Sequence, residues 1–261
     1  MTLDDIYKNH QVFEQLSKYS GFYKDLSYSV MGFILQGTKS VPNIDTYVYS
    51  SIQGTLESIK SILTQGRIND SYALLRKYHD AAIINIYSHL YLDDHFSLQN
   101  FVVDKIDQWL RGKAQLPEYR VMSEYIRASF KLKKITDLLY RDDTYKELRD
   151  RCNDHTHYNF YYNLLQNDNE IYLKRLAILN KFSKDLENIF IILHVSYLFY
   201  LEGHYMMSSD YVDSLDCGIT PEEGSQYYVA PFVQEMFDSI IKKNRMDLMM
   251  EIKTKTSLSL E

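Results

Sequence analysis

The sequence predicts an all-α protein, a helical bundle of about nine or ten helices with long antiparallel helices. Apolar residues recur at helical spacing from one end of the chain to the other, and no convincing alternation typical of β-strands interrupts them. The 261 residues include only nine glycines and four prolines, too few for the many turns of a β-sandwich or barrel. With 45% hydrophobic residues, the chain can bury a sizeable core as one large domain or as a bundle with an appended lobe.

The expected helices follow one another with short breaks, and apolar residues three or four positions apart define each of them. Gly21 and Gly66 end two of these helices, whereas Pro117 and Pro231 begin two others. The predicted helices span about 3–19, 22–36, 45–66, 69–90, 101–110, 117–126, 143–165 and 170–201, and a final helix starts at 231.

The chain divides into two parts of different composition. Residues 1–202 form the predicted bundle, and residues 203–261 form an irregular acidic loop followed by a C-terminal helix packed on that bundle. The most apolar run, 189–201, is 13 residues long, shorter than the ~20 residues that a membrane-spanning helix needs. This run is therefore expected at the bundle centre or in a dimer seam, and no association with a membrane is predicted.

Composition also limits the classes of function. A net charge of −6 provides no global positive field for nucleic acid, so any RNA site must be local. Two cysteines cannot build a disulfide framework or a four-ligand zinc site, and the acids of 203–231 do not match an EF-hand, so no metal site and no cofactor are expected. The acidic N-terminus lacks an apolar signal core, which together with the cysteine count indicates a cytoplasmic protein.

The densest set of reactive side chains lies in 148–158, which holds two arginines, two histidines and an asparagine. On a helix, Arg149, Asn153 and His157 fall at about 0°, 40° and 80° and share one face, while Arg151 and His155 form a second pair roughly opposite. An imidazole supplies a proton shuttle near neutral pH, and a guanidinium stabilises a pentavalent phosphorus, so the set suits phosphodiester cleavage without a metal. In an arbitrary chain, the commoner reading is a solvated face or a hydrogen-bonded pair between helices.

This segment resembles the motif of HEPN domains, all-helical modules whose signature places an arginine, often followed by a polar residue, four to six residues before a histidine. Arg149 with His155 and Arg151 with His157 both fit that spacing, and a looser Arg-x3-Asn-x3-His form fits Arg149, Asn153 and His157. Cys152 follows Arg151 where the family favours Asn, Asp or His, which makes Arg149 the better match.

The resemblance implies a metal-independent endoribonuclease that acts as a homodimer with a composite site. His157 or His155 would then move the proton, Arg149 or Arg151 would stabilise the phosphorane, and Asn153 would orient the imidazole or the phosphate. The setting that it implies is a bacterial toxin or a defence against phage, with RNA as the substrate and an antitoxin or regulator as a further partner. Because the family includes inactive members, the alternative is a non-catalytic helical module that binds nucleotide, RNA or a protein.

Several side chains outside this face are candidates for holding the substrate. One basic stretch, 120–141, precedes the motif in an otherwise acidic chain and carries aromatic residues between its cations, a pattern that suits a phosphate backbone but is also common on solvated helices. Arg76, one turn from Asp80, either joins the phosphate site or forms a structural ion pair. A buried Arg149 paired to a carboxylate such as Asp80 would favour the structural reading. The candidates for substrate binding are Arg76, Arg127, Lys131, Lys133, Lys134 and Tyr158.

Overall fold

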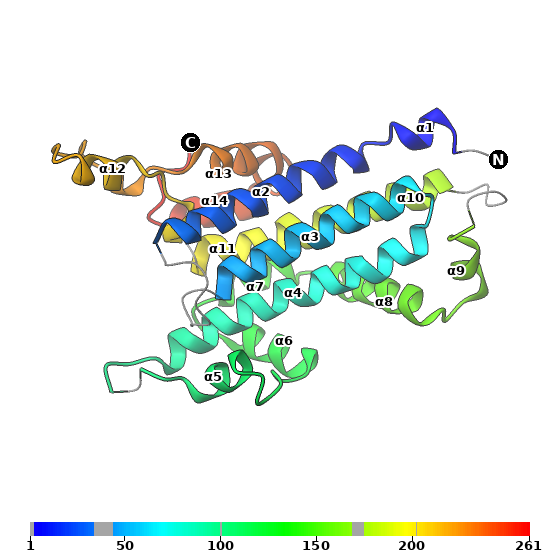
Figure 1. The fold of residues 1–261 in the computed structure, drawn as a ribbon, viewed down its shortest axis with the longest axis horizontal. Coiled ribbons are helices and arrows are strands. Elements are labelled where there is room, and N and C mark those ends of the chain that lie inside the picture. The colour runs from blue at the N-terminus through cyan, green and yellow to red at the C-terminus, as the bar shows by residue number, and fades with distance from the viewer. Residues whose placement is uncertain (1–2, 34–43, 100, 169–174, 202) are drawn as a thin grey trace.

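The computed structural model describes residues 3–33, 44–99, 101–168, 175–201 and 203–261 (Figure 1). The prediction of an all-α fold is confirmed, because these residues form helices and no β-strand; Met207 and Val229 make an isolated β-bridge. None of the helices in these ranges is long and apolar enough to cross a membrane.

Three long helices lie side by side and carry the bundle: α2 (Val12–Phe33), α3 (Ile44–Thr64) and α4 (Ile68–His95) (Figure 1). The periodicity of α3 shows why they pack. Its residues Tyr49, Ile52, Leu56, Ile59 and Leu63, three and four positions apart, are all fully buried. The opposite face of α3 is polar, so one stripe of the helix enters the core and the other remains in water.

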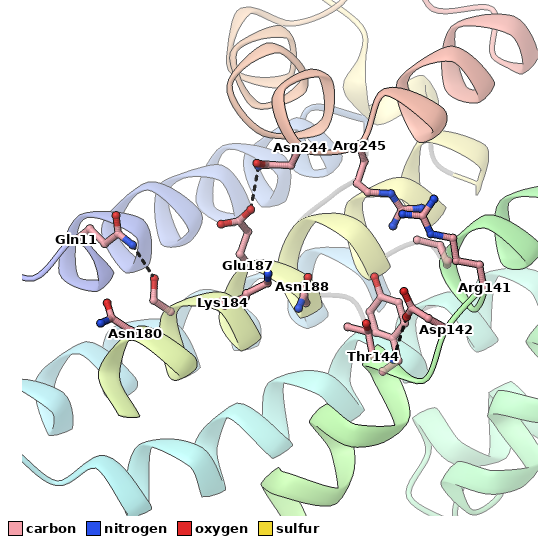
Figure 2. A pocket seen from close by; sticks show the side chains of 13 residues that line it. Gln11, Arg141, Asp142, Thr144, Asn180, Lys184, Glu187, Asn188, Asn244 and Arg245 are labelled. Atoms are coloured by element: carbon pink, nitrogen blue, oxygen red, sulfur yellow. Dashed lines mark hydrogen bonds between the residues drawn. The ribbon is translucent and has the colours of Figure 1, made fainter. Parts of the chain in front are cut away.

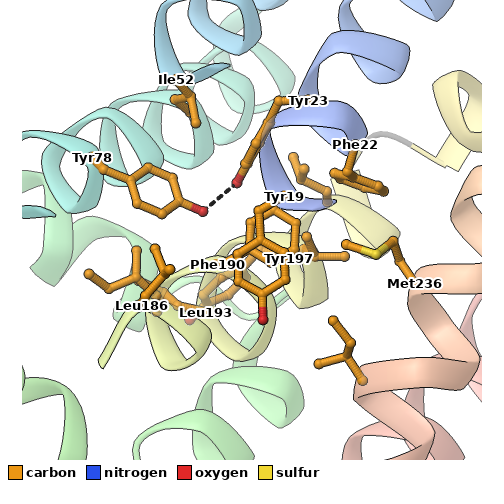
Figure 3. Close-up of a cluster of buried hydrophobic side chains, with 14 of the residues drawn as sticks. Tyr19, Phe22, Tyr23, Ile52, Tyr78, Leu186, Phe190, Leu193, Tyr197 and Met236 are labelled. Atoms are coloured by element: carbon orange, nitrogen blue, oxygen red, sulfur yellow. Dashed lines mark hydrogen bonds between the residues drawn. The ribbon is translucent and has the colours of Figure 1, made fainter. Parts of the chain in front are cut away.

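The apolar run predicted at the bundle centre or in a dimer seam lies at the centre. It follows α10 (Arg175–Glu187) and forms most of the π-helix η2 (Asn188–Val195) and all of α11 (Ser196–Leu201). Phe190 is fully buried and stacks on Tyr19 with ring centroids 3.8 Å apart, surrounded by aromatic and aliphatic side chains from several helices (Figure 3). Most of the described side chains of η2 and α11 are therefore buried in the core.

Polar side chains inside the core form a hydrogen-bonded chain between helices. The Tyr23 hydroxyl lies 2.8 Å from that of Tyr78 and 2.5 Å from Nδ1 of His194, and Nε2 of His194 donates to Asn85 Oδ1 over 2.8 Å. Asn85 in turn donates to Asp45. Burial lowers the pKa of His194 to about 3, so this ring is neutral at physiological pH. The chain has 24 tyrosines, and this use explains part of that number, because each of these tyrosines buries its ring while its hydroxyl keeps a partner.

Shorter helices cover the end of α4 and one flank of the bundle. The predicted helix over 143–165 is in fact two helices, because Tyr158 adopts a left-handed conformation with φ of 51° and stops the first. The expected loop after 203 also contains a short exposed helix, and the final helix is divided by the π-helix η5 (Phe237–Lys242), so more helices form than the nine or ten predicted. The remaining helices are α1 (Asp5–Lys8), α5 (Asp104–Leu110), α6 (Tyr119–Ala128), α7 (Lys133–Leu139), α8 (Thr144–His157), α9 (Tyr161–Leu165), η3 (Gly203–Met206), α12 (Asp210–Asp216), η4 (Ser225–Tyr227), α13 (Pro231–Met236) and α14 (Met246–Lys255).

Candidate functional site

The helix α8 lies against α4, and their contact brings together two arginines that are far apart in the sequence. Arg149 of α8 donates from Nη1 to Asp80 Oδ1 over 3.1 Å, and Arg76 of α4 forms an ion pair with the same oxygen. Arg76 also donates from Nε to Asn153 Oδ1 over 2.9 Å. Arg76, Asp80, Arg149 and Asn153, which we call the arginine cluster, therefore form one connected group across two helices.

Tyr119, the first residue of α6, forms one wall of the arginine cluster. The guanidinium carbon of Arg149 lies 3.1 Å from the centroid of the Tyr119 ring, and that of Arg76 lies 5.6 Å away. Stacking of a guanidinium on an aromatic face is favourable and fixes the plane of the guanidinium. Tyr119 was not among the residues predicted from the sequence, because its distance from the motif along the chain hides the contact.

The electrostatics of the cluster follow from the shared carboxylate. Although burial alone would raise the pKa of Asp80, interactions with the His79 ring and with the guanidinium of Arg76 lower it below its ordinary value, so Asp80 is ionised. Burial also lowers the pKa of the neighbouring His79, which stays neutral. Two guanidinium groups thus share one carboxylate, and their ion pairs leave one positive charge in excess. The side chains of Arg76 and Arg149 remain 16% and 19% exposed, so part of the cluster faces solvent.

His157, the last residue of α8, is exposed one helical turn beyond Asn153. Tyr158 follows in the left-handed conformation, and next to it Phe160, Tyr161 and Tyr162 expose between 49% and 75% of their surface. The rings of Phe160 and Tyr162 stack with centroids 5.7 Å apart. We call Tyr158, Phe160, Tyr161 and Tyr162 the aromatic strip. The density of aromatic residues from 158 to 162 was visible in the sequence, but their exposure was not.

The second predicted pair, Arg151 and His155, points to other partners. Arg151 donates to Asp185 of α10 from Nη2 over 2.7 Å and from Nε over 3.0 Å, and Asp185 is completely buried. His155 is buried, stacks on Tyr72 with centroids 4.0 Å apart, and donates from Nδ1 to Asn69 Oδ1 over 2.8 Å. These contacts join α8 to α4 and α10. The two histidines distinguish the faces, because His157 is exposed and His155 is buried, whereas the side chains of Arg149 and Arg151 are 19% and 25% exposed.

The burial of His155 predicts an acid-sensitive fold. Burial lowers the pKa of His155 to about 4, below the ordinary value of 6.5, so the unfolded chain binds more protons than the folded chain between these pH values. The stability present at pH 7 is therefore lost as the pH falls, by about 2 kcal/mol at pH 5 from this residue alone. Urea unfolding at pH 7 and pH 5 should show a loss that is smaller by this amount in His155→Asn. Equal pH dependence in the two proteins would contradict this assignment.

The four candidate cations of the basic stretch, Arg127, Lys131, Lys133 and Lys134, are mostly engaged with nearby partners. Lys133 and Asp137 lie 3.2 Å apart, Lys134 and Glu251 lie 3.0 Å apart, and Lys131 pairs with Asp93. Arg127 donates to the backbone oxygen of Ser123 and stacks over Tyr140. Exposed pairs of this kind are weak and can open for a stronger partner, so they do not exclude a role in binding.

The chain has no recognisable relative in the comparisons with known proteins. No protein-family model matches it, and neither a curated protein nor a solved structure matches. Within the described ranges, no three side chains of His, Cys, Asp or Glu come together so that they could hold a metal ion.

Proposed function

We propose that the chain is a metal-independent endoribonuclease of HEPN type whose site consists of the arginine cluster and His157. The observation that supports this proposal is that Arg76 and Arg149 share Asp80. On α8, Asn153 lies one helical turn from Arg149, and the exposed imidazole of His157 lies two turns from it. The excess positive charge can be neutralised by a phosphate, because guanidinium groups bind phosphate oxygens through paired hydrogen bonds.

In the proposed reaction, the ribose 2′-oxygen attacks phosphorus and the bond from phosphorus to the 5′-oxygen breaks. His157 transfers the proton of the 2′-hydroxyl or of the leaving 5′-oxygen, and the two guanidinium groups stabilise the negative charge of the phosphorane. Asn153 holds Arg76 in place through its amide oxygen. The products are a 2′,3′-cyclic phosphate and a 5′-hydroxyl, so no water is consumed in this step.

The aromatic strip favours single-stranded RNA as the substrate. Its four exposed rings begin directly after His157, and unpaired bases stack on exposed aromatic side chains with little dependence on sequence. Bases held there would place their backbone near His157, while a duplex would keep its bases away from the rings.

A second candidate, a non-catalytic module that binds a phosphate of nucleotide or RNA or a protein partner, is favoured by the pairing of Arg149 with Asp80. This arginine is already neutralised in part and lies flat on Tyr119. Such pairing favours a structural or purely binding role, because an arginine that must follow a developing charge has to exchange one of these contacts.

The cleavage assay that separates the two candidates uses purified protein and single-stranded RNA. We expect cleavage that survives an excess of EDTA and leaves 2′,3′-cyclic phosphate ends, detected by their resistance to direct 3′ ligation. Loss of activity in EDTA would overturn the metal-independent mechanism. Retention of RNA in a gel shift without any cleavage would support the binding module instead.

The proposal also includes partners. HEPN resemblance implies a homodimer with a composite site, a role in a toxin or anti-phage system, and an antitoxin or regulator. Since the apolar run 189–201 lies in the core, the dimer is now expected to use the surface around His157, while the aromatic strip stays open to RNA. Sedimentation at micromolar concentration should show a dimer, and a pure monomer would count against the composite site.

A further inference from the structure

A polar groove separate from the arginine cluster lies between the start of α8, the helix α10 and the residues that precede α14 (Figure 2). Its main cavity has a volume of about 540 Å³. A second cavity of about 300 Å³ shares Gln11, Glu187 and Asn244 with the first, so the two continue into each other. A volume of this size falls in the range of sites for small molecules.

One end of the groove has more hydrogen-bond donors than acceptors. Arg245 and Arg141 lie close together there (Figure 2) and share Asp247: Arg245 donates to it over 2.7 and 2.8 Å, and Arg141 over 3.2 Å. Asp142 lines the same end, and hydrogen bonds from Thr144, one of them from its backbone N–H over 3.0 Å, lower the pKa of this carboxylate. Within the described residues Arg141 donates one hydrogen bond, to Asp247, and its side chain is 56% exposed, so other N–H groups of Arg141 can bind a ligand.

The hydroxyl of Tyr145 adds a buried donor to the same end. Tyr145 lines the groove, is only 4% exposed, and its hydroxyl has no hydrogen-bond partner within the described ranges. An unpaired buried hydroxyl destabilises the folded state, so it indicates a missing partner. The guanidinium groups of Arg141 and Arg245 lie at the same end. An anion with several acceptor oxygens could accept hydrogen bonds from these two groups and from the Tyr145 hydroxyl.

The remainder of the groove is lined by neutral amides. Gln11 and Asn180 lie at the end opposite the arginines, with Asn188 and Lys184 between them (Figure 2). Asn180 already accepts from Nε2 of His10 over 2.8 Å, and Gln11 donates to Ser183 over 3.5 Å. The amide groups that remain suit hydroxyl groups or the edge of a base. Glu187 accepts a hydrogen bond from Asn244 over 2.9 Å, so its carboxylate has a partner away from the arginine end.

We propose that this groove binds a phosphate monoester of the size of a nucleotide or sugar phosphate. The phosphate lies at Arg141, Arg245 and Tyr145, and the polar body of the ligand extends along Asn188 toward Asn180 and Gln11. This site is distinct from the proposed ribonuclease site, because Tyr145 and His157 are twelve residues apart on α8, about 18 Å along a helix. The inference therefore does not depend on ribonuclease activity.

Binding is tested by thermal unfolding and calorimetry of the full chain with AMP and glucose 6-phosphate, each compared with adenosine or glucose and with inorganic phosphate. We expect at least one monoester to raise the thermal midpoint by about 3 °C at tenfold its Kd and to exceed both its unphosphorylated parent and inorganic phosphate. A monoester that binds no better than its parent and inorganic phosphate overturns the proposal.

Two variants separate ligand binding from folding. Arg141→Ala should weaken binding of the monoester at least tenfold, while Arg111→Ala, which removes an equally exposed arginine paired with Asp107 outside the groove, should not. Tyr145→Phe should keep or raise the midpoint of the free protein, because its hydroxyl has no partner, and should reduce the shift caused by the monoester. Equal binding by Arg141→Ala and Arg111→Ala would overturn the assignment of the phosphate end.

Discussion

Replacing His157 with alanine is expected to remove nearly all cleavage of single-stranded RNA while leaving the thermal midpoint close to that of the wild type. The residue is exposed at the end of α8, so little packing is lost. A group that transfers a proton in the transition state typically contributes ~10² to 10⁴ in rate. The cleavage rate and the thermal midpoint are measured on the same preparation, so that loss of activity cannot be confused with unfolding.

His95→Ala provides the matched control, since His95 is also exposed and is the last residue of α4. Its cleavage rate should equal that of the wild type. Arg149→Ala should lower the rate as His157→Ala does if Arg149 faces the phosphorane. A wild-type protein that leaves RNA intact, together with an unfolded His157→Ala, would show that the motif is structural.

Arg151→Ala is expected to lower the free energy of unfolding by about 3–5 kcal/mol, because it leaves the buried charge of Asp185 without its guanidinium partner. The hydroxyl of Tyr72 binds Asp185 over 3.1 Å without a charge, and the half-exposed Lys181 lies 3.8 Å from the same carboxylate, so we expect a loss near the lower end of this range. Urea unfolding monitored by circular dichroism measures the change. The control Arg120→Ala breaks an exposed pair with Glu124 and should leave the urea midpoint almost unchanged.

A double variant separates the charge of Asp185 from its packing. Adding Asp185→Asn to Arg151→Ala should recover part of the lost stability, since an amide is cheaper to bury than an unpaired carboxylate. If Arg151→Ala alone is as stable as Arg120→Ala, the ion pair does not hold α8 in place. The rate of RNA cleavage should fall less in Arg151→Ala than in Arg149→Ala when the rates are compared at equal amounts of folded protein.

Local periodicity was enough to predict the fold class and several of the helices, but α2 continues from Val12 to Phe33 through Gly21, where the sequence predicted a break. Stripes such as Leu56, Ile59 and Leu63 are properties of neighbouring residues, so they are readable without a structure. The break after His157 was missed, because Tyr158 in a left-handed conformation carries no composition signal of the kind that glycine gives. No composition signal marked α12 or the π-helices either.

The candidate site was predictable in content but not in the partners of its residues. Helical geometry correctly separates Arg149 and Asn153 from Arg151 and His155, because angles along a helix follow from spacing alone. Whether a given arginine is buried depends on Asp80 or Asp185, which belong to other helices. Such long-range contacts are decided by packing, so the sequence left three registers of the motif open, whereas the structure separates an exposed His157 from a buried His155.

The sharing of Asp80 has a genetic consequence. If either Arg76 or Arg149 is lost, the remaining arginine keeps the whole carboxylate and the surplus charge disappears, so each single change should abolish phosphate attraction nearly as fully as both together. Loss of Asp80 has the opposite sign for charge, because it leaves two guanidinium groups that repel each other and favour an anion more strongly. Non-additive effects of changes at Arg76, Asp80 and Arg149 on phosphate binding would therefore indicate that the cluster serves to carry surplus charge. Additive effects would indicate that it serves only to join the two helices.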